Sequence, residues 1–492
     1  MLGCHYGPKG FRDRVPRVET NGLPSGGRVL CVAMFIAILF AVPLPPQVAQ
    51  RLLGGALTDG VAYSRLAELT DTIGPRLSGS AGAEAAVRWA RQKFQQDGLS
   101  VHLEAVKVPH WVRGEERGEI LPEPGIVGHP LVLTALGGSV GTPAGGATGE
   151  VVEAHSIAEI AALGDKARGK IVFLNHTMGT KGGYGDFVGL RTRGPSEAGK
   201  VGAAAVVLRS LATASLRSPH TGTLVYDPAA PRIPAAAVSV EDAELIHRLL
   251  QRGTVRIRLW LGCRWLPDAD SANVVADVRG REIPDEIVLL GAHLDSWDLA
   301  TGATDDGAGV VIVMEVGRLL VKDLPRRTVR IVLYMNEENG LAGGKGYAAA
   351  HEAELTRHIA ALEADSGSGR PVGVTMHAGE GGVALLKPWL GPLESLGLGE
   401  PAEGEAGGAD IGPMAPAAVP FVGIQQETSH YFDTHHSAAD TLDKVQPESL
   451  GKAAAAFAVV AYALAEMPQP LPRPAAQPAR NRQEPAKPAP AH

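Results

Sequence analysis

From Ser271 onward, short apolar segments with strand character alternate with segments of helical spacing. The strand-like segments are EIVLLGAHLD, TVRIVLYMNEE and HIAALEADSG, and helices are expected over 306–321 and 344–354. A strand that is followed by a crossover helix returns to the same sheet as a parallel strand. The alternation therefore predicts an α/β fold, with a mostly parallel sheet that carries helices on both faces. In such sheets the functional groups gather at the carboxyl ends of the strands.

Changes of composition along the chain predict how this fold is divided. Between about 125 and 265, short β-like runs such as KIVFLN and VRIRLWL are separated by Gly and Pro, which indicates a β-rich module. The last segment is rich in Pro and Ala, has no apolar period and is expected to be disordered. The expected parts are a leader, a main domain in two pieces around an inserted β-rich domain, and a tail: 1–50, 51–124 with 266–467, 125–265, and 468–492.

The leader carries several basic residues and then an apolar run over 29–44 that is broken by Pro43. This order is typical of a secretory signal, and the run is short for a membrane span. We therefore expect an exported protein, periplasmic or extracellular. Cleavage near Ala49 is one way to remove the segment, although PPQVAQ is a poor cleavage site. A retained anchor and a translation start at Met34 are the alternatives, so a membrane is a partner only if the segment is not cleaved.

The overall charge and the cysteines exclude two classes of protein. Lys and Arg number 46 against 53 Asp and Glu, a net charge of −7, so no positive field is available to hold a nucleic acid. Among the three cysteines, Cys4, Cys31 and Cys263, no two have ligand spacing, which excludes a disulfide framework and a Cys-rich zinc site. A metal in this chain must therefore be held by His, Asp and Glu.

Acidic and His residues occur in five clusters, each at the end of an expected strand, at the start of a helix or in a late loop. The clusters are His293 with Asp295, Asp305 with Asp306, Glu337 with Glu338, Asp365, and His435 with His436. One such residue could belong to a solvated surface face, but the whole set in phase with strand ends indicates a shared cleft. A cleft with so many carboxylates repels itself unless cations neutralise it.

The residue types of the cleft favour zinc. Imidazole and carboxylate together suit this metal, and the ligands suffice for two ions, about 3.5 to 4 Å apart, that share one bridging carboxylate. Asp305 is the natural bridge, because a turn at a helix start can present both of its oxygens outward. In the Glu337–Glu338 pair, consecutive strand side chains point apart, so one can bind metal while the other faces the open position. A carboxylate beside a water at that position is a general base.

Taken in order, GAHLDSWD, GATDDGAG, NEENGLAGGKGY, EADSG and HHSAADT resemble the co-catalytic di-zinc exopeptidases, the family that includes bacterial secreted aminopeptidases and glutamate carboxypeptidases. The resemblance spans about 271–445. More weakly, the β-rich stretch is similar to the protease-associated domain that this family inserts into its peptidase domain. The resemblance implies the di-zinc exopeptidase fold, two zinc ions as cofactors and a peptide as substrate.

The resemblance also implies which residues bind metal. One zinc ion would be held by His293 and Asp365, the other by Glu338 and His436, and both by the bridging Asp305. His436 is preferred to His435 because the family's ligand lies four residues before the Asp of an xDT element, here Asp440.

Further residues receive roles from the same resemblance. Glu337 would be the general base, and Asp295 would orient a histidine ligand through its other ring nitrogen. Asp306, which follows the bridging acid, would help to fix the loop. His435 or Tyr431 would stabilise the oxyanion, with simple loop packing as the alternative.

We therefore expect a zinc-dependent exopeptidase that hydrolyses dipeptides or short peptides. A non-catalytic binding homologue is the alternative from another class, although it should have lost ligands, and cyclisation of N-terminal glutamine is an alternative chemistry. Amino- and carboxypeptidase specificity both stay open, because Asp298 or Asp433 could hold a free amine, and Lys345 or Arg370 a terminal carboxylate. The sequence also leaves open whether the chain acts alone or as a homodimer.

Overall fold

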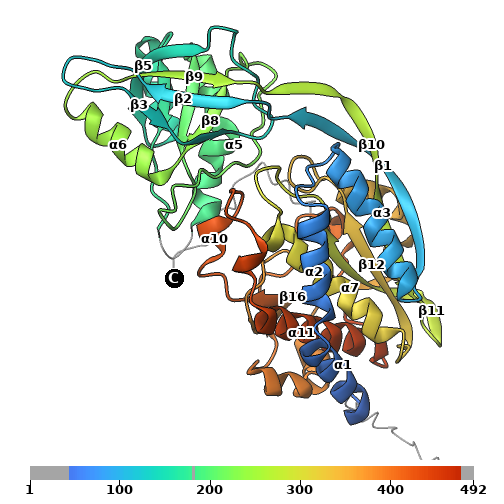
Figure 1. The fold of residues 1–492 in the computed structure, drawn as a ribbon. Helices are drawn as coiled ribbons and strands as arrows, with labels where there is room; N and C mark the ends of the chain where they lie inside the picture. Colours follow the sequence, from blue (N-terminus) through green and yellow to red (C-terminus); the bar gives the residue numbers. More distant parts are fainter. Residues whose placement is uncertain (1–43, 180–182, 478–492) are drawn as a thin grey trace, which may run out of the picture. The chain divides into compact units, whose positions relative to one another are not determined.

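Figure 1 shows the computed structural model, which describes residues 44–179 and 183–477. All of these residues belong to one compact unit, Ala41–His492. Nearly all of the expected signal segment, through residue 43, and the end of the expected tail, 478–492, lie outside the described residues. The export signal, the retained anchor and the start at Met34 therefore stay predictions.

The first sheet has eight strands, in the order β1-β10-β12-β11-β13-β16-β14-β15. Their bounds are β1 (Ser100–Val112), β10 (Arg264–Val278), β12 (Arg327–Tyr334), β11 (Ile283–His293), β13 (His358–Glu363), β16 (Phe421–Gln426), β14 (Pro371–His377) and β15 (Ala402–Glu403). Neighbours are parallel in the centre, from β12 through β11 and β13 to β16. They are antiparallel where β1, β10 and β14 flank that centre. The predicted α/β fold is confirmed, with its parallel pairs in the middle of the sheet.

The helices outside the segment between β1 and β10 include α11, which is apolar along most of its length. Their bounds are α1 (Pro46–Thr58), α2 (Val61–Thr72), α3 (Ala81–Gln96), α7 (Ala308–Leu320), α8 (Ala342–Ala350), α9 (Gly382–Leu386), α10 (Tyr431–Thr434) and α11 (Pro447–Glu466). Within the described residues, α11 is the one helix that is long and apolar enough to cross a membrane by length and composition. Its apolar window is 83% buried inside the protein, as in a core helix of a folded domain.

Helices cover both faces of the first sheet, and for that reason the central strands are apolar along their length. Every residue over 287–293 of β11 is buried. Val288 and Leu290 pack in the core that also contains α7 and α11, whereas Leu289 packs on the opposite face with Tyr347 of α8. Strand side chains alternate between faces, so one strand supplies both cores.

A second sheet is built from residues that lie between β1 and β10 in the sequence, in the order β3-β2-β9-β5-β6-β7-β8-β4. Its elements are β2 (Glu116–Ile120), β3 (His129–Leu131), β4 (Leu133–Ala135), β5 (Ala147–Ala154), α4 (Ile157–Leu163), β6 (Ile171–Leu174), α5 (Tyr184–Lys200), β7 (Ala205–Arg209), β8 (Ala235–Val238), α6 (Val240–Leu250) and β9 (Arg256–Leu261). Helix α5 was not expected, because its glycines and Pro195 are breaker signals. The sheet begins at Glu116, ahead of residue 125, and the inserted domain with its boundaries stays a prediction.

The start of the described chain is part of the core. Helix α1 begins at Pro46, and both Leu44 and Ala49 are buried. Cleavage near Ala49, as considered from the sequence, would therefore cut the first turn of a packed helix.

The segment after α11 is more ordered than the sequence suggested. Leu471 is buried, and the guanidinium of Arg473 donates hydrogen bonds to the carbonyl oxygens of Ala417 and His358. The expectation of disorder from Pro468 is therefore wrong for 468–477. The segment has no regular apolar period, but the burial of Leu471 and the hydrogen bonds from Arg473 to the backbone hold it on the protein.

Candidate metal centre

The carboxyl ends of three neighbouring strands carry most of the predicted site. His293 ends β11, Glu337 and Glu338 follow β12, and Asp365 follows β13. These strands are parallel neighbours, so their ends meet at one edge of the sheet. The turn Ala303–Gly307 before α7 supplies Asp305 and Asp306, and the segment after α10 supplies His435 and His436. The structure brings the five predicted clusters to one place.

His293, Asp305 and Asp365 form one group, whose ligand atoms all lie within 4.8 Å of one another. Nε2 of His293 is 3.1 Å from Oδ1 of Asp305 and 3.6 Å from Oδ1 of Asp365. His293 and Asp305 are buried, and Asp365 is partly exposed, so the group opens to solvent on one side. One imidazole with two carboxylates is a donor set that suits zinc.

A second group shares Asp305 with the first. The ligand atoms of Asp305, His435 and His436 also lie within 4.8 Å of one another. Nε2 of His436 is 3.2 Å from Oδ2 of Asp305 and 3.1 Å from Oε2 of Glu338. Nε2 of His435 is 3.5 Å from the same Asp305 oxygen. The two oxygens of Asp305 therefore face different histidines, Oδ1 toward His293 and Oδ2 toward His436.

The site attracts positive charge. Burial opposes a charge on His293, but hydrogen bonds to Asp305 and Asp365 outweigh burial and raise the pKa of the imidazole well above its ordinary value. Burial likewise opposes a charge on His436, yet the carboxylate of Glu338 raises its pKa to about 10. Among the described residues, no hydrogen-bond partner reaches the buried Oε1 of Glu338. A bound cation would satisfy this oxygen and release protons from the imidazoles, so the residues present fit zinc.

Asp295 holds the segment that carries the acidic pair. Its carboxylate accepts hydrogen bonds from the backbone N–H of Asn336 at 2.8 Å and of Glu337 at 3.1 Å. The sequence suggested that this carboxylate orients His293. In the structure, Nδ1 of His293 lies 3.0 Å from the backbone oxygen of Asp295 and 3.9 Å from the nearer carboxylate oxygen. The backbone oxygen therefore fixes the ring, because the carboxylate is engaged by the amides of the next strand end.

The acidic pair lies in a turn, although the sequence analysis treated it as a continuation of the strand. β12 ends at Tyr334, and Asn336 has φ +74°. A residue in the left-handed region turns the chain out of the strand. Strand alternation therefore does not separate the carboxylates of Glu337 and Glu338. They are distinguished by contact instead, because Glu338 is the one that lies 3.1 Å from His436.

Two further carboxylates fix the turn that presents Asp305. Asp306 accepts a hydrogen bond from the N–H of His293 at 3.1 Å, which fits the loop-fixing role expected of it. Asp440 accepts from the N–H of Thr304 at 2.7 Å and from the N–H of Asp305 at 3.1 Å. Sequence reasoning used Asp440 only as a spacing marker. The xDT element was the signal that could have identified Asp440 as a contact of the turn that contains Asp305.

His435 and Tyr431 lie beside His436. The rings of Tyr431 and His435 have centroids 5.0 Å apart, and His435 stacks on His436 at 3.5 Å. Burial and the neighbouring His436 hold the pKa of His435 well below its ordinary value, so this imidazole is neutral. A neutral imidazole can donate one hydrogen bond to an oxyanion. The oxyanion role of His435 or Tyr431 stays a prediction.

Three of the four residues considered for binding a peptide end have partners of their own. A nitrogen of Arg113 donates to Asp298 at 3.0 Å, and Oγ1 of Thr213 donates to Asp433 at 2.6 Å. Lys345, in α8, donates to the backbone oxygen of Gly340, which precedes that helix, at 2.9 Å. These contacts do not select between recognition of a free amine and of a terminal carboxylate.

Residues of the second sheet's segment contact the site, and sequence reasoning missed them. The N–H of Thr221 donates to the carbonyl oxygen of His436 at 2.8 Å. Tyr184, at the start of α5, stands edge-on to His435 with ring centroids 5.1 Å apart, and α10 faces α5 in Figure 1. Contacts between segments so far apart in the chain leave no local sequence pattern that could have revealed them.

Trp297 connects the metal centre to the same segment. It lines a small hollow together with Asp305, Glu338 and His436. Its ring lies against Gly137, where an added Cβ would be 1.9 Å from the indole. A side chain at position 137 would therefore displace Trp297 from the hollow.

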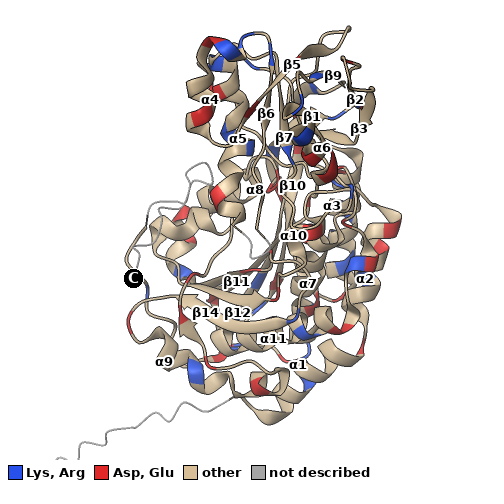
Figure 2. Ribbon diagram, turned by 90° about the vertical axis from the view of Figure 1, so that its left-hand side faces the viewer, with Lys and Arg blue, Asp and Glu red and all other residues tan. Residues whose placement is uncertain are grey.

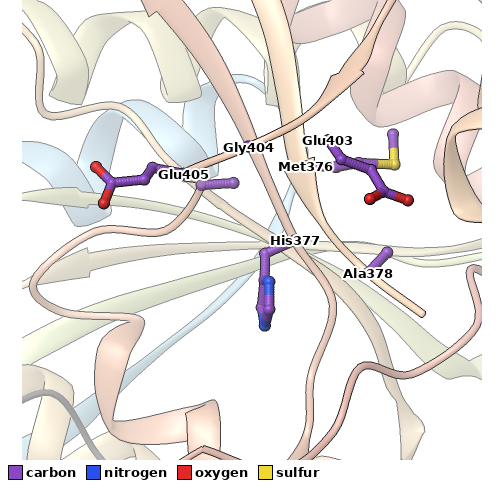
Figure 3. Close-up of a pocket in the computed structure, with 7 residues that line it drawn as sticks. Met376, His377, Ala378, Glu403, Gly404 and Glu405 are labelled. Atoms are coloured by element: carbon purple, nitrogen blue, oxygen red, sulfur yellow. The ribbon is translucent and has the colours of Figure 1, made fainter. Parts of the chain in front are cut away.

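A larger cavity, of about 320 Å³, lies away from the predicted site (Figure 3). It is lined by residues of β14, β15 and the chain that follows them: Met376, His377, Ala378, Glu403, Gly404, Glu405 and Ala406. None of these is a predicted site residue. We therefore place the candidate active site at the strand ends.

Figure 2 shows that acidic and basic residues are interspersed along outer helices such as α2.

Comparison with known proteins identifies the family of the chain. The model for Peptidase family M28 matches residues 273–461. The chain is similar to carboxypeptidase Q of Mus musculus, with 42% identity over 418 residues, 84% of this chain and 87% of the mouse protein. It is also similar to a solved Peptidase M28 precursor from Shewanella amazonensis SB2B, with 39% identity and a TM-score of 0.84 over 87% of this chain and 98% of that one.

A more distant structure shares the fold alone. It is a zinc aminopeptidase from Bacillus subtilis, with 20% identity and a TM-score of 0.62 over 82% of this chain and 95% of that one. The family resemblance inferred from the sequence, which is strongest toward carboxypeptidase Q through HLDSWD and the doubled histidine, is confirmed.

Proposed function

The chain belongs to peptidase family M28, and on that premise we propose that it is a zinc-dependent exopeptidase, similar to carboxypeptidase Q, that hydrolyses dipeptides or short peptides. The single observation that carries the proposal is the geometry of Asp305. One of its oxygens lies 3.1 Å from His293 and the other lies 3.2 Å from His436. Two buried ligand groups that share one carboxylate support a pair of ions, which is the arrangement of two-metal hydrolases.

We assign the ligands as follows. One ion would be held by His293 and Asp365, the other by Glu338 and His436, and Asp305 would be shared by both. When bound, zinc supplies Lewis acidity that acidifies a water and polarises the scissile carbonyl. His435 also lies close to the second group, and its stacking on His436 suits it to contact the substrate.

Glu337 is the proposed general base. It is 3% exposed, and its N–H is anchored to Asp295 at 3.1 Å. Its neighbour Glu338 is directed at His436, which leaves Glu337 as the carboxylate for proton transfer. Glu337 takes the proton of the attacking water and returns it to the leaving amine.

Replacing Glu337 with Gln tests this role. The amide keeps the shape of the side chain and cannot accept the proton, so we expect kcat to fall by about 10² to 10⁴-fold. Zinc content by elemental analysis should stay at the wild-type value. Turnover within a few-fold of wild type would contradict the assignment.

The activity itself is tested with dipeptides blocked at either end, with and without a chelator. Cleavage that survives an N-terminal block but not a C-terminal block is expected of a carboxypeptidase. The reverse pattern would make the chain an aminopeptidase of the same fold. Hydrolysis that a strong chelator leaves unchanged, or no hydrolysis of any peptide in the zinc-loaded protein, would contradict the proposal.

We also propose that the protein is exported, on the strength of the basic and then apolar order of the leader. Because Leu44 and Ala49 are buried in the core, we place any cleavage before Leu44. N-terminal sequencing of the exported protein tests this placement.

A further inference from the structure

Arg76 is a fully buried cation that lies beside the candidate metal centre. It is 0% exposed and comes from the connection between α2 and α3. Apart from Gly74, two positions before it, the residues that its guanidinium contacts lie more than two hundred positions later. Nothing in its local sequence singles it out. An arginine with no access to water must satisfy its donors inside the protein.

Its guanidinium binds backbone oxygens instead of side chains. Nε donates to the oxygen of Leu294 at 2.9 Å, one terminal nitrogen donates to the oxygen of Thr301, and the other donates to the oxygen of Gly302 at 3.1 Å. The backbone N–H of Arg76 also donates to Oγ of Ser296 at 3.2 Å. One side chain therefore ties together both ends of the segment 294–302.

That segment connects two of the predicted ligands. It starts directly after His293 and ends directly before the turn that contains Asp305. At Gly302, with φ +56°, an added Cβ would lie 2.4 Å from Cβ of Ser296, so the segment folds closely onto itself. The distance between His293 and Asp305 depends on how this segment is held.

The charge of Arg76 is a separate matter from its hydrogen bonds. Burial lowers the pKa of its guanidinium, and the carboxylates of Asp440 and Asp295 oppose that shift. A positive charge near the ligands would repel a metal cation, whereas a rigid segment would favour its binding. Lysine would keep the charge but could not reach three separate carbonyl oxygens with a planar fork.

We propose that Arg76 is a positioning residue of the metal centre, whose guanidinium clamps the segment 294–302 so that His293 and Asp305 are held ready for the same ion. The proposal rests on the proposed function in so far as that ion is zinc. The clamp itself is made only of the chain's own atoms.

The test compares wild type with Arg76→Lys and Arg76→Met. Zinc affinity is measured by competition with a colorimetric chelator, and we expect both variants to bind zinc about 10-fold or more weakly, the usual loss when a residue that supports metal ligands is changed. In the metal-free proteins, amide hydrogen exchange over 294–302 should be faster in both variants than in wild type.

Arg65→Lys is the matched control. Arg65 is also buried, at 9% exposure, but its guanidinium pairs with Asp97 at 2.6 Å, between α2 and the end of α3. This variant should lose thermal stability without a change in zinc affinity or in exchange over 294–302.

Three results would overturn the clamp. Zinc affinity and exchange at wild-type values in Arg76→Lys would show that only the charge matters. Lower thermal stability with unchanged zinc affinity in both variants would show a purely structural role. Unchanged exchange over 294–302 in both variants would refute the clamp, whether or not the wild type binds zinc. A wild type that binds no zinc would refute the proposed function and not the clamp. If Arg76→Met does not fold, the Lys variant decides.

Discussion

The two halves of the candidate metal centre are held in different ways. In the first half, His293 and Asp365 follow parallel strands of one sheet, and Asp305 begins the helix that packs on it. In the second half, Glu338 comes from the same sheet, but His436 lies in a segment that packs against residues of the second sheet. The first half lies within the first sheet and the connections that support it, Arg76 and Asp440 included. The second half also depends on contacts with the segment that forms the second sheet.

His436, in the second half, has an unusual backbone conformation. His436 has φ +58°, in the left-handed region that few residues other than glycine adopt. Its carbonyl oxygen accepts from Thr221, and Asp433, three positions earlier, accepts from Oγ1 of Thr213 at 2.6 Å. The difference between the halves shows that the segment of the second sheet helps to hold His436, one of the proposed metal ligands, in place.

The largest effect is expected where the halves meet. Asp305→Asn keeps the shape of the side chain but removes the charge that both ions would share, so we expect zinc content to fall from about two ions per chain toward none. Elemental analysis measures this. Asp298→Asn, which changes an acid held by Arg113, is the control and should keep its zinc. Wild-type zinc content in Asp305→Asn would show that the halves do not share a ligand.

The next effect separates the halves. His436→Phe should remove one zinc ion and leave the other, because only the second half loses a ligand. His435→Phe is the matched control, since it changes the adjacent ring, and it should keep both ions. Chelator titrations of the two variants distinguish them. Loss of metal in His435→Phe and not in His436→Phe would exchange the roles of the two residues.

A smaller effect tests the hold of the second sheet's segment. Thr213→Val removes the hydroxyl that donates to Asp433 and keeps the side-chain shape. A hydrogen bond to a charged group contributes about 1.5 to 3 kcal/mol. We therefore expect about 10-fold weaker binding of the ion of the second half, with the other ion unaffected. Equal weakening of both ions would remove the distinction between the halves.

The least effect on the metal centre is expected from His358, which begins β13 at the end opposite the two halves. Burial lowers the pKa of His358 to about 4, and its Nε2 accepts from the hydroxyl of Tyr347 at 2.8 Å. As the pH falls, His358 takes up a proton in the unfolded chain before it does so in the folded chain. The contribution of the neutral His358 to the free energy of unfolding is therefore present above about pH 6.5 and is lost as the pH falls toward 4.

Urea unfolding of the metal-free protein measures this contribution. Between pH 7 and pH 4.5, wild type should lose more of its unfolding free energy than His358→Gln, by on the order of 2 to 3 kcal/mol. The same pH dependence in both proteins would show that His358 titrates in the fold as it does in the unfolded chain.

Local patterns in the sequence were sufficient for the frame and for the clusters of the site. Alternating apolar strands and helices predicted β11, β12, β13 and α7, and the acidic and His residues fell at their ends. The clusters meet because parallel neighbours bring their carboxyl ends together. This part of the prediction needed only spacing along the chain.

Contacts between distant segments could not be predicted in this way. Three such contacts join residues that share no motif. They are the hydrogen bonds of Arg76 to the segment 294–302, the hydrogen bond that Asp440 accepts from Asp305, and the hydrogen bond from Thr221 to His436. The turn at Glu337 was missed for the same reason, because the amide of Asn336 donates to Asp295, which lies in the segment after β11.

The most direct test of the shared Asp305 is anomalous X-ray diffraction at the zinc edge, on crystals of the zinc-loaded protein. We expect two peaks about 3.5 to 4 Å apart, one on each side of the Asp305 carboxylate. A single peak, or two peaks of which only one contacts Asp305, would contradict the account.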